Sequence, residues 1–289
     1  MTDWTRVERA VYRVRQHYRY TYTGPVWDLR QRLVMIPRDV SRDQRTLNYE
    51  LDVRGTEGDH LVFWERDAFG NRVAKVIANR VPLAVDFEAT FRVERVRQDG
   101  PQLEPTPWEG RGWEIYLEHT ALTAPDLQLE RAARGIADES RDRRVRAELA
   151  HEWASHAIRY QYGVTGYTTP AAMALHLGKG VCQDYTHLAL AILRALGLPA
   201  RYVSGYLYPI TGSTTSSVGT TTIGESHAWV EFWAGDWVAA DPTGLVAVAE
   251  RHIVVARGRD YADVRPLSGV YHGPPAESLG VKVELTRLR

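Results

Sequence analysis

The 289-residue sequence contains a single cysteine, Cys182, which excludes an intrachain disulfide. It also lacks any apolar run near the roughly 20 residues that a helix needs to cross a bilayer. The opening residues Met1 to Arg9 have no apolar core of the kind found in signal peptides. We therefore expect a cytoplasmic protein whose fold depends on packing and hydrogen bonds.

The sequence has no excess charge of either sign, because 36 Lys and Arg residues balance 36 Asp and Glu residues. This balance provides no long-range attraction to nucleic acid or to an anionic membrane, so we expect neither as a partner. No phosphate-binding Gly-x-x-x-x-Gly-Lys-Ser/Thr loop and no dinucleotide fingerprint occurs. His151 and His156 are five positions apart, which turns them away from a shared helix face and from zinc binding. We therefore predict no cofactor and no metal.

The first part of the chain has the pattern of β-strands. Between residues 12 and 22, tyrosines and a valine at even positions alternate with arginines and other polar residues. Similar short segments follow at 46–53, 60–66, 71–78 and 83–96. Successive strands without an intervening helix predict an antiparallel β-sandwich-like domain over residues 1–110. The Pro- and Gly-bearing segment 99–112 is predicted to be a linker.

From about Leu127 the apolar residues recur with helical spacing. Residues 141–162 predict a long amphipathic helix with Val145, Leu149, Trp153, Ala157 and Tyr160 on its buried stripe. Residues 168–178 predict a short helix that begins with a capping Thr and a Pro at the first helical position and stops at Gly178. A third helix spans 180–197, with Leu188, Ile192 and Leu196 facing inward, and carries Cys182 in its first turn.

Strands are predicted again at 200–208, 227–233, 237–240 and 281–288. Helices followed by antiparallel strands indicate an α+β fold, and we assign residues 111–289 to a second, catalytic domain. Residues 210–224 are rich in Gly, Ser and Thr and precede His227. They form either a flap over a site or a surface insertion, and the sequence does not favour one over the other.

Cys182 lies where a helix N-terminus favours a thiolate, and two later residues have the chemistry to assist it. If residues 234–236 form a hairpin turn, His227 pairs with position 243, and Asp241 lies two residues away on the same face. Each residue alone has an ordinary explanation: a buried thiol, a strand histidine and a turn-initiating aspartate. Together they favour a nucleophile, a base and an orienting carboxylate.

Three neighbours of these residues also need interpretation. Tyr185 and Trp229 flank the candidate catalytic residues, and they either form the walls of a substrate cleft or belong to the core. Asp184 is in the first turn of the Cys182 helix, where a carboxylate is favoured by the helix dipole. We interpret Asp184 as a helix cap.

Four motifs occur in order: Gly180-Val-Cys-Gln-Asp-Tyr-Thr-His-Leu, Gly197-Leu-Pro-Ala-Arg-Tyr-Val-Ser-Gly, His227-Ala-Trp-Val-Glu and Trp237-Val-Ala-Ala-Asp-Pro-Thr. In these segments the sequence resembles the transglutaminase-like superfamily, a papain-related group with animal transglutaminases, peptide N-glycanases and bacterial cysteine proteases. Segments 67–71 and 258–269 resemble the N-terminal β domain and the C-terminal region of bacterial members. The resemblance therefore covers most of the chain.

This resemblance implies a papain-like or transglutaminase-like core, with helices packed on an antiparallel sheet or barrel. It also implies a catalytic triad of Cys182, His227 and Asp241 that forms a thioester with an amide substrate. Water as the second reactant gives a peptide or amide hydrolase, which we rank first because water is the default acceptor. An amine gives a protein-glutamine transferase, ranked second, and a non-catalytic peptide-binding module is ranked third.

The resemblance leaves part of the site open. Animal transglutaminases use an upstream Trp to hold the oxyanion, and the nearest upstream Trp here is Trp153 in the predicted long helix. The backbone N–H of Cys182 is one candidate oxyanion donor, and the second is unassigned. No Asp-x-Asp-x-Asp-Gly run occurs, so we do not expect calcium dependence. We expect a peptide, protein or isopeptide-type amide substrate, and the oligomeric state stays open.

Overall fold

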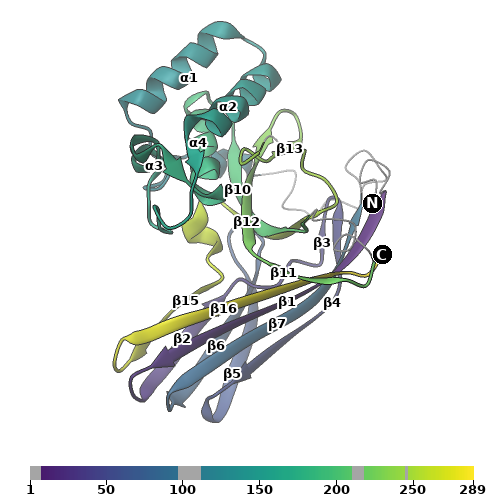
Figure 1. Ribbon diagram of the computed structural model, residues 1–289, viewed down its shortest axis with the longest axis vertical. Coiled ribbons are helices and arrows are strands. Elements are labelled where there is room, and N and C mark those ends of the chain that lie inside the picture. The colour runs from purple at the N-terminus through teal and green to yellow at the C-terminus, as the bar shows by residue number, and fades with distance from the viewer. Residues whose placement is uncertain (1–7, 97–111, 210–217, 245–246) are drawn as a thin grey trace.

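A computed structural model describes residues 8–96, 112–209, 218–244 and 247–289 of the chain. A β-sandwich forms one end of the molecule, and a helix-covered sheet forms the other (Figure 1). The α+β fold class predicted above is confirmed.

The sandwich consists of two antiparallel sheets. The strand order of the larger sheet is β11-β16-β1-β7-β4-β3, and that of the smaller is β15-β2-β6-β5. The larger sheet contains β1 (Arg9–Tyr22), β3 (Val40–Ser41), β4 (Gln44–Arg54), β7 (Ala84–Val96), β11 (Thr221–Gly224) and β16 (Ala276–Arg287). The smaller contains β2 (Val26–Leu33), β5 (Glu57–Arg66), β6 (Arg72–Val81) and β15 (Leu267–His272).

The alternation that predicted the first strand is confirmed by burial. Tyr12, Val14 and Tyr18 on β1 are each at most 5% exposed. Gln16 is buried on the same face, and its Oε1 accepts a hydrogen bond of 2.6 Å from the Tyr206 hydroxyl. The inner face of β1 thus joins the sandwich to the other half of the molecule.

The C-terminal strands return to the sandwich. β16 pairs with β1 along most of its length, β15 pairs with β2, and β11 is added outside β16. The predicted domain 111–289 therefore contains three sandwich strands as well as the helix-covered sheet. A period of two identifies a strand but does not choose its partner. The linker predicted over 99–112 lies outside the described residues, except for Gly112.

The other half combines four helices with a third antiparallel sheet, of order β13-β12-β10-β14. In the described residues the helices are α1 (Leu127–Glu139), α2 (Arg143–Ala157), α3 (Ala171–Leu177) and α4 (Cys182–Ala195). The strands are β10 (Ala200–Leu207), β12 (Ser226–Trp233), β13 (Trp237–Ala240) and β14 (His252–Gly258), with a short parallel pair β8 (Arg159–Tyr160) and β9 (Lys179–Gly180). The single-turn 3₁₀ helices are η2 (Trp113–Tyr116) and η3 (Tyr261–Val264). No helix of the described part is both long and apolar enough to span a bilayer.

Two helix predictions need correction. The helix predicted over 141–162 ends at Ala157, because Arg159 and Tyr160 leave it to form β8 beside β9. Its buried face consists of Ala147, Ala150 and Ala154, whereas Val145, on the predicted stripe, is 41% exposed. Small alanine side chains let α2 pack closely on α4, which a search for large apolar residues overlooks. The Pro at the start of α3, Pro170, is its N-cap rather than its first helical residue.

Two amide side chains of the sandwich fix β14, the edge strand of the helix-covered sheet. Gln44 donates to Val254 O at 2.7 Å and accepts from Val254 N at 2.9 Å. Asn71 makes the same pair of bonds to the backbone of Arg257, at 2.7 and 2.8 Å. Because β14 is the edge strand of its sheet, these amides satisfy backbone groups that a neighbouring strand would otherwise occupy. The two halves are therefore held in a defined orientation.

Candidate active site

Cys182 is the first residue of α4, as the sequence predicted. The Asp184 carboxylate caps this helix start: its Oδ2 accepts from Val181 N at 2.8 Å and from Thr165 Oγ1 at 2.6 Å. Burial raises the pKa of Asp184 above its ordinary value. A Cβ at position 180 would lie 2.6 Å from Asp184, so Gly180 is required for this close approach. The predicted capping role of Asp184 is confirmed.

The hairpin predicted from the turn at 234–236 has the expected register. Trp233 pairs with Trp237 and Val230 with Ala240, so β12 and β13 carry His227 and Asp241 to the same face. His227 Nε2 and Asp241 Oδ2 are 2.6 Å apart. Asp241 Oδ1 also accepts from the backbone N–H of Thr243 at 3.0 Å. The carboxylate is therefore held by both of its oxygens.

His227 lies between Asp241 and Cys182. The Cys182 side chain is a second hydrogen-bond partner of the ring. Because Nε2 contacts Asp241, Nδ1 is the ring nitrogen available to Cys182. Burial acts to lower the pKa of His227, but hydrogen bonds to Asp241 and Cys182 and their negative charges outweigh it and raise the pKa to about 10. Burial acts to raise the pKa of Asp241, yet hydrogen bonds from His227 and His252 hold it below its ordinary value. The site therefore favours an imidazolium beside the thiol.

His252 on β14 is a member of the site that the sequence did not reveal. It is fully buried, and its Nε2 lies 3.3 Å from Asp241 Oδ2. Its Nδ1 accepts from the backbone N–H of Ala249 at 3.2 Å, which leaves the ring proton on Nε2, facing the carboxylate. Burial lowers the pKa of His252, so this ring is neutral and contacts the same Asp241 oxygen as His227. No sequence motif surrounds His252, and its strand was not among those predicted.

The ligand atoms of His227, Asp241 and His252 lie within 4.8 Å of one another, a grouping that could hold a metal ion. A histidine binds a metal through an unprotonated nitrogen. The nearest nitrogen of His252 carries its proton, because the other one is an acceptor. His227 and His252 are therefore joined through hydrogen bonds to the Asp241 carboxylate.

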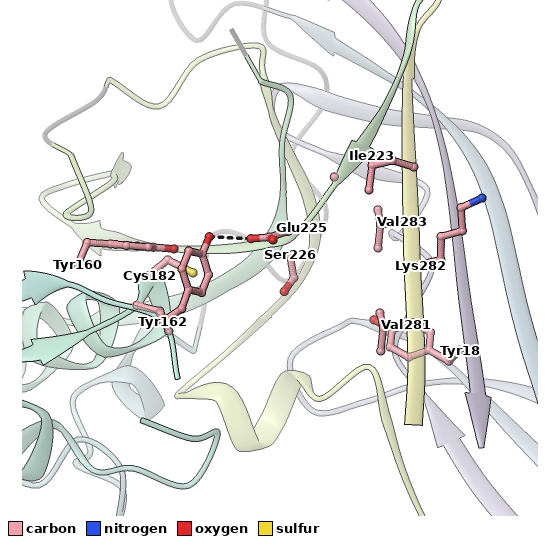
Figure 2. Close-up of a pocket in the computed structure, with 12 residues that line it drawn as sticks. Tyr18, Tyr160, Tyr162, Cys182, Ile223, Glu225, Ser226, Val281, Lys282 and Val283 are labelled. Atoms are coloured by element: carbon pink, nitrogen blue, oxygen red, sulfur yellow. Dashed lines mark hydrogen bonds between the residues drawn. The ribbon is translucent and has the colours of Figure 1, made fainter. Parts of the chain in front are cut away.

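Cys182 opens into a cleft of about 450 Å³ between the two halves of the molecule (Figure 2). On the Cys182 side the cleft is lined by Tyr160, Tyr162 and Glu225, and Tyr162 donates to Glu225 Oε2 at 2.8 Å. Tyr160 is hydrogen-bonded to Tyr162; burial, this bond and the nearby Cys182 charge all raise the pKa of Tyr160. On the sandwich side the lining residues are Tyr18, Ile223, Val281, Lys282 and Val283.

Tyr185 and Trp229, predicted as possible cleft walls, are 3% and 0% exposed and do not line the cleft. The Tyr185 hydroxyl donates to Ile158 O at 2.7 Å, and its ring stacks on Tyr160 with centroids 6.3 Å apart. The Trp229 ring lies 6.0 Å from that of His227 and 5.2 Å from that of His252. Both residues are therefore part of the core, and their rings pack against side chains that form the site.

The segment 210–224 is described only from residue 218. Residues 210–217, where a flap or insertion was considered, lie outside the described residues. Thr221–Gly224 form strand β11 on the edge of the sandwich, so this part of the segment is regular structure, neither flap nor insertion. Ile223 and Gly224 line the cleft from this strand.

Comparisons with known proteins agree with this architecture. Residues 130–242 match the family model described as the transglutaminase-like superfamily, and residues 12–94 match the bacterial transglutaminase-like N-terminal region. An uncharacterized protein of Mycobacterium bovis is 31% identical over 281 residues, which cover 90% of this chain and 87% of that protein. The chain belongs to the transglutaminase-like superfamily.

A second uncharacterized protein and one solved structure are also similar to this transglutaminase-like chain. An uncharacterized protein of Mycobacterium leprae is 43% identical over 172 residues, so the match spans only 60% of its length. The crystal structure of a "putative cysteine protease" from Cytophaga hutchinsonii has a TM-score of 0.73 at 19% identity and covers 96% of this chain and 91% of its own. The latter similarity shows a shared fold.

Proposed function

We propose that this chain is a thiol-dependent amide or peptide bond hydrolase with Cys182 as its nucleophile. The observation that carries the proposal is the buried 2.6 Å contact between His227 and Asp241 beside the Cys182 side chain. This contact keeps the imidazole charged and fixes its orientation, so that the other ring nitrogen faces the sulfur.

In the first step, the Cys182 thiolate attacks the carbonyl carbon of the substrate amide. The tetrahedral intermediate collapses as the C–N bond breaks, and the His227 imidazolium gives its proton to the departing amine. The acyl group is then held as a thioester on Cys182, and His227 is neutral. Asp241 stays ionised throughout and stabilises each charged form of the ring.

The oxyanion needs donors beside Cys182. The backbone N–H of Cys182 at the start of α4 supplies the first. For the second, which the sequence left open, Tyr160 is the best-placed side chain, because it lines the cleft and lies close enough to feel the Cys182 charge. Its hydroxyl is bonded to Tyr162, and turning that proton toward the substrate oxygen completes the pair of donors.

In the second step, neutral His227 takes a proton from water, which attacks the thioester carbonyl carbon. The C–S bond then breaks, the acid is released, and the Cys182 thiolate and His227 imidazolium are restored. Water has access because Tyr160 and Tyr162 at the cleft are 43% and 64% exposed. An acceptor amine would compete only where a site excludes water, so this exposure favours hydrolysis over amine transfer.

The test is a product screen with peptides, isopeptides and amide substrates, in the presence and absence of a labelled primary amine. We expect new carboxylates from the wild-type protein and none from Cys182→Ala of unchanged melting temperature. Products that carry the labelled amine at glutamine side chains, without free acid, would replace hydrolysis with amine transfer. No product in either arm, with Cys182 also unlabelled by thiol-directed peptide electrophiles, would contradict the proposed enzyme.

A further inference from the structure

The strand β16 has an open edge next to the cleft. On one side β16 is paired with β1 from Ala276 to Arg287, whereas on the other side β11 pairs only from Val283 to Thr286. β11 ends at Gly224 and the chain turns into β12. Among the residues that the structure describes, no strand therefore pairs with the outer edge of β16 between 276 and 282.

The backbone groups of this open edge are directed outward at known positions. On the β11 side, Arg287 O accepts from Gly219 N at 2.7 Å. In a strand, alternate residues direct their N–H and C=O to the same side, and the pairing of β16 with β1 has no irregularity from 287 to 279. The N–H and C=O groups of Val281 and Leu279 therefore point to the open side.

The same edge is apolar and exposed. Val281 is 55% exposed, Leu279 is 45% exposed, and Ile223 at the end of β11 is 69% exposed. Sheets ordinarily protect an edge with charges, proline, a bulge or a covering segment, since an open edge pairs readily with another chain. Between 276 and 282 the charged side chains are those of Glu277 and Lys282, and the segment contains no proline.

The open edge is continuous with the catalytic cleft. Val281, Lys282 and Val283 line the same cavity as Cys182, and Figure 2 shows them across the cleft from Tyr160, Tyr162 and Glu225. A cavity of about 450 Å³ is within the ~300–1,000 Å³ range of ligand sites. A cavity of this size accommodates a single extended chain, and its continuity with Cys182 makes a substrate segment the occupant.

We infer that the acyl-donor substrate is an extended polypeptide segment that binds as an added strand on the open edge of β16, in line with β11, and so delivers its amide to Cys182. Pairing with Val281 and Leu279 recognises the backbone of the segment, so the substrate class is flexible or unfolded polypeptide. This inference rests on the proposed function for the role of Cys182, but the binding itself does not require turnover.

The test uses the full chain with Cys182→Ala, so that bound peptide is not consumed. The probes are a randomised pool of octapeptides and the same pool N-methylated at every amide. An added strand pairs through its own N–H groups, so we expect the methylated pool to lose at least tenfold in retention. Equal retention of the two pools, or no retention of the unmethylated pool, would overturn the inference.

A second variant tests the position of binding. Proline at 281 removes only an outward N–H, so Val281→Pro in the Cys182→Ala protein leaves the β1 pairing in place. We expect a loss of at least tenfold in pool retention, with Val281→Thr, which keeps the N–H and the branched shape, as the matched control. Melting curves verify that both variants fold. Unchanged retention by folded Val281→Pro contradicts binding at β16 even if the protein hydrolyses peptides. Retention that is lost on N-methylation and in Val281→Pro, without turnover by the wild-type protein, contradicts only the proposed function.

Discussion

Strand β12 carries two buried groups of charged side chains, and their difference shows what makes one of them a candidate site. At its start His227 contacts Asp241 Oδ2, and His252 contacts the same oxygen. Four residues on, buried Glu231 accepts from Arg201 Nε at 2.6 Å and from Arg257 Nε at 2.8 Å. In both groups a carboxylate lies between two nitrogen donors.

The pKa of each carboxylate reflects this pairing. Burial acts to raise the pKa of Glu231, but the charges and hydrogen bonds of Arg201 and Arg257 hold it well below its ordinary value. The same direction holds for Asp241, whose partners are histidines. A lowered pKa is therefore shared by both groups and does not distinguish them.

The partners distinguish them. A guanidinium does not release its proton at accessible pH, and Arg201 is further fixed 3.9 Å above the Trp237 ring, so the Glu231 group can only hold the sheet together. An imidazole exchanges its proton, and His227 faces the thiol of Cys182. Burial and pairing mark both groups, whereas a mobile proton next to a nucleophile marks one.

The comparison is tested most sharply by replacing the carboxylate of each group with an amide, beginning with Asp241 in the group that contains His227. Asp241→Asn removes the charge that favours the imidazolium and alters the tautomer of His227. We expect kcat for peptide hydrolysis to fall by about 10⁴-fold, the size seen when a triad carboxylate becomes an amide. Steady-state kinetics measure this, and a kcat within tenfold of wild type would remove Asp241 from the mechanism.

The matched change in the other group is Glu231→Gln. It leaves two buried guanidinium groups without a countercharge, so we expect a loss of about 3–5 kcal/mol in the free energy of unfolding. Urea denaturation measures the loss. Since Glu231 touches no reacting group, kcat per folded molecule should stay near wild type; a large fall in kcat with little change in stability would make the two groups alike.

Substitution of Tyr160 tests its proposed role as the second hydrogen-bond donor to the oxyanion. Tyr160→Phe removes one proposed donor, and we expect kcat to fall by about 10²–10³-fold with little change in KM. Tyr162→Phe is the control on the same wall, because it keeps the Tyr160 hydroxyl, and its kcat should change much less. Equal effects of the two substitutions would show a shared structural role.

His252 is argued to act through Asp241, so its substitution should cost less. For His252→Leu we expect a fall of about 10–100-fold in kcat, by analogy with other residues that orient a functional side chain. The pKa of His227 should change as well, because Asp241 loses a fixed hydrogen bond. His252→Gln, which retains a donor, should recover part of both; a stability loss without any change in the His227 pKa would make His252 purely structural.

The smallest effect is a difference in titration between the two histidines. His227 should remain charged through neutral pH and lose its proton near its pKa of about 10, whereas burial keeps His252 neutral over the same range. A folded pKa above the ordinary value means that His227 stabilises the fold fully below pH 6.5, and that this contribution is lost as the pH rises through about 10. Ring ¹⁵N shifts measure both histidines. In Cys182→Ala the His227 pKa should fall; a neutral His227 at pH 7 in wild type contradicts the ion pair.

Much of this site follows from the sequence because its key contacts are local. The turn at 234–236 fixes the register of β12 and β13 and so brings His227 to Asp241. Similarly, a glycine, a cap and an amphipathic stretch locate the start of α4. Such features depend on neighbours within about a dozen residues, where strand and helix periods suffice.

The rest depends on contacts between distant segments. The pairing of β1 with β16 joins the two ends of the chain, and periodicity alone does not select it. His252 reaches Asp241 only because β14 lies beside β10, and the stripe of small alanines on α2 is defined by its contact with α4. The cleft itself, with Val281 opposite Tyr160, exists only once both halves are assembled.

The central claim is that Cys182, assisted by His227, forms a thioester with an amide substrate. The most direct measurement is intact-mass and peptide mass spectrometry after rapid acid quench during turnover of the octapeptide pool. The account predicts acyl adducts that map to Cys182, are removed by hydroxylamine and are absent from Cys182→Ala. Turnover that continues in Cys182→Ala, or wild-type turnover that never yields an adduct at Cys182 while His227→Ala is equally active, would contradict it.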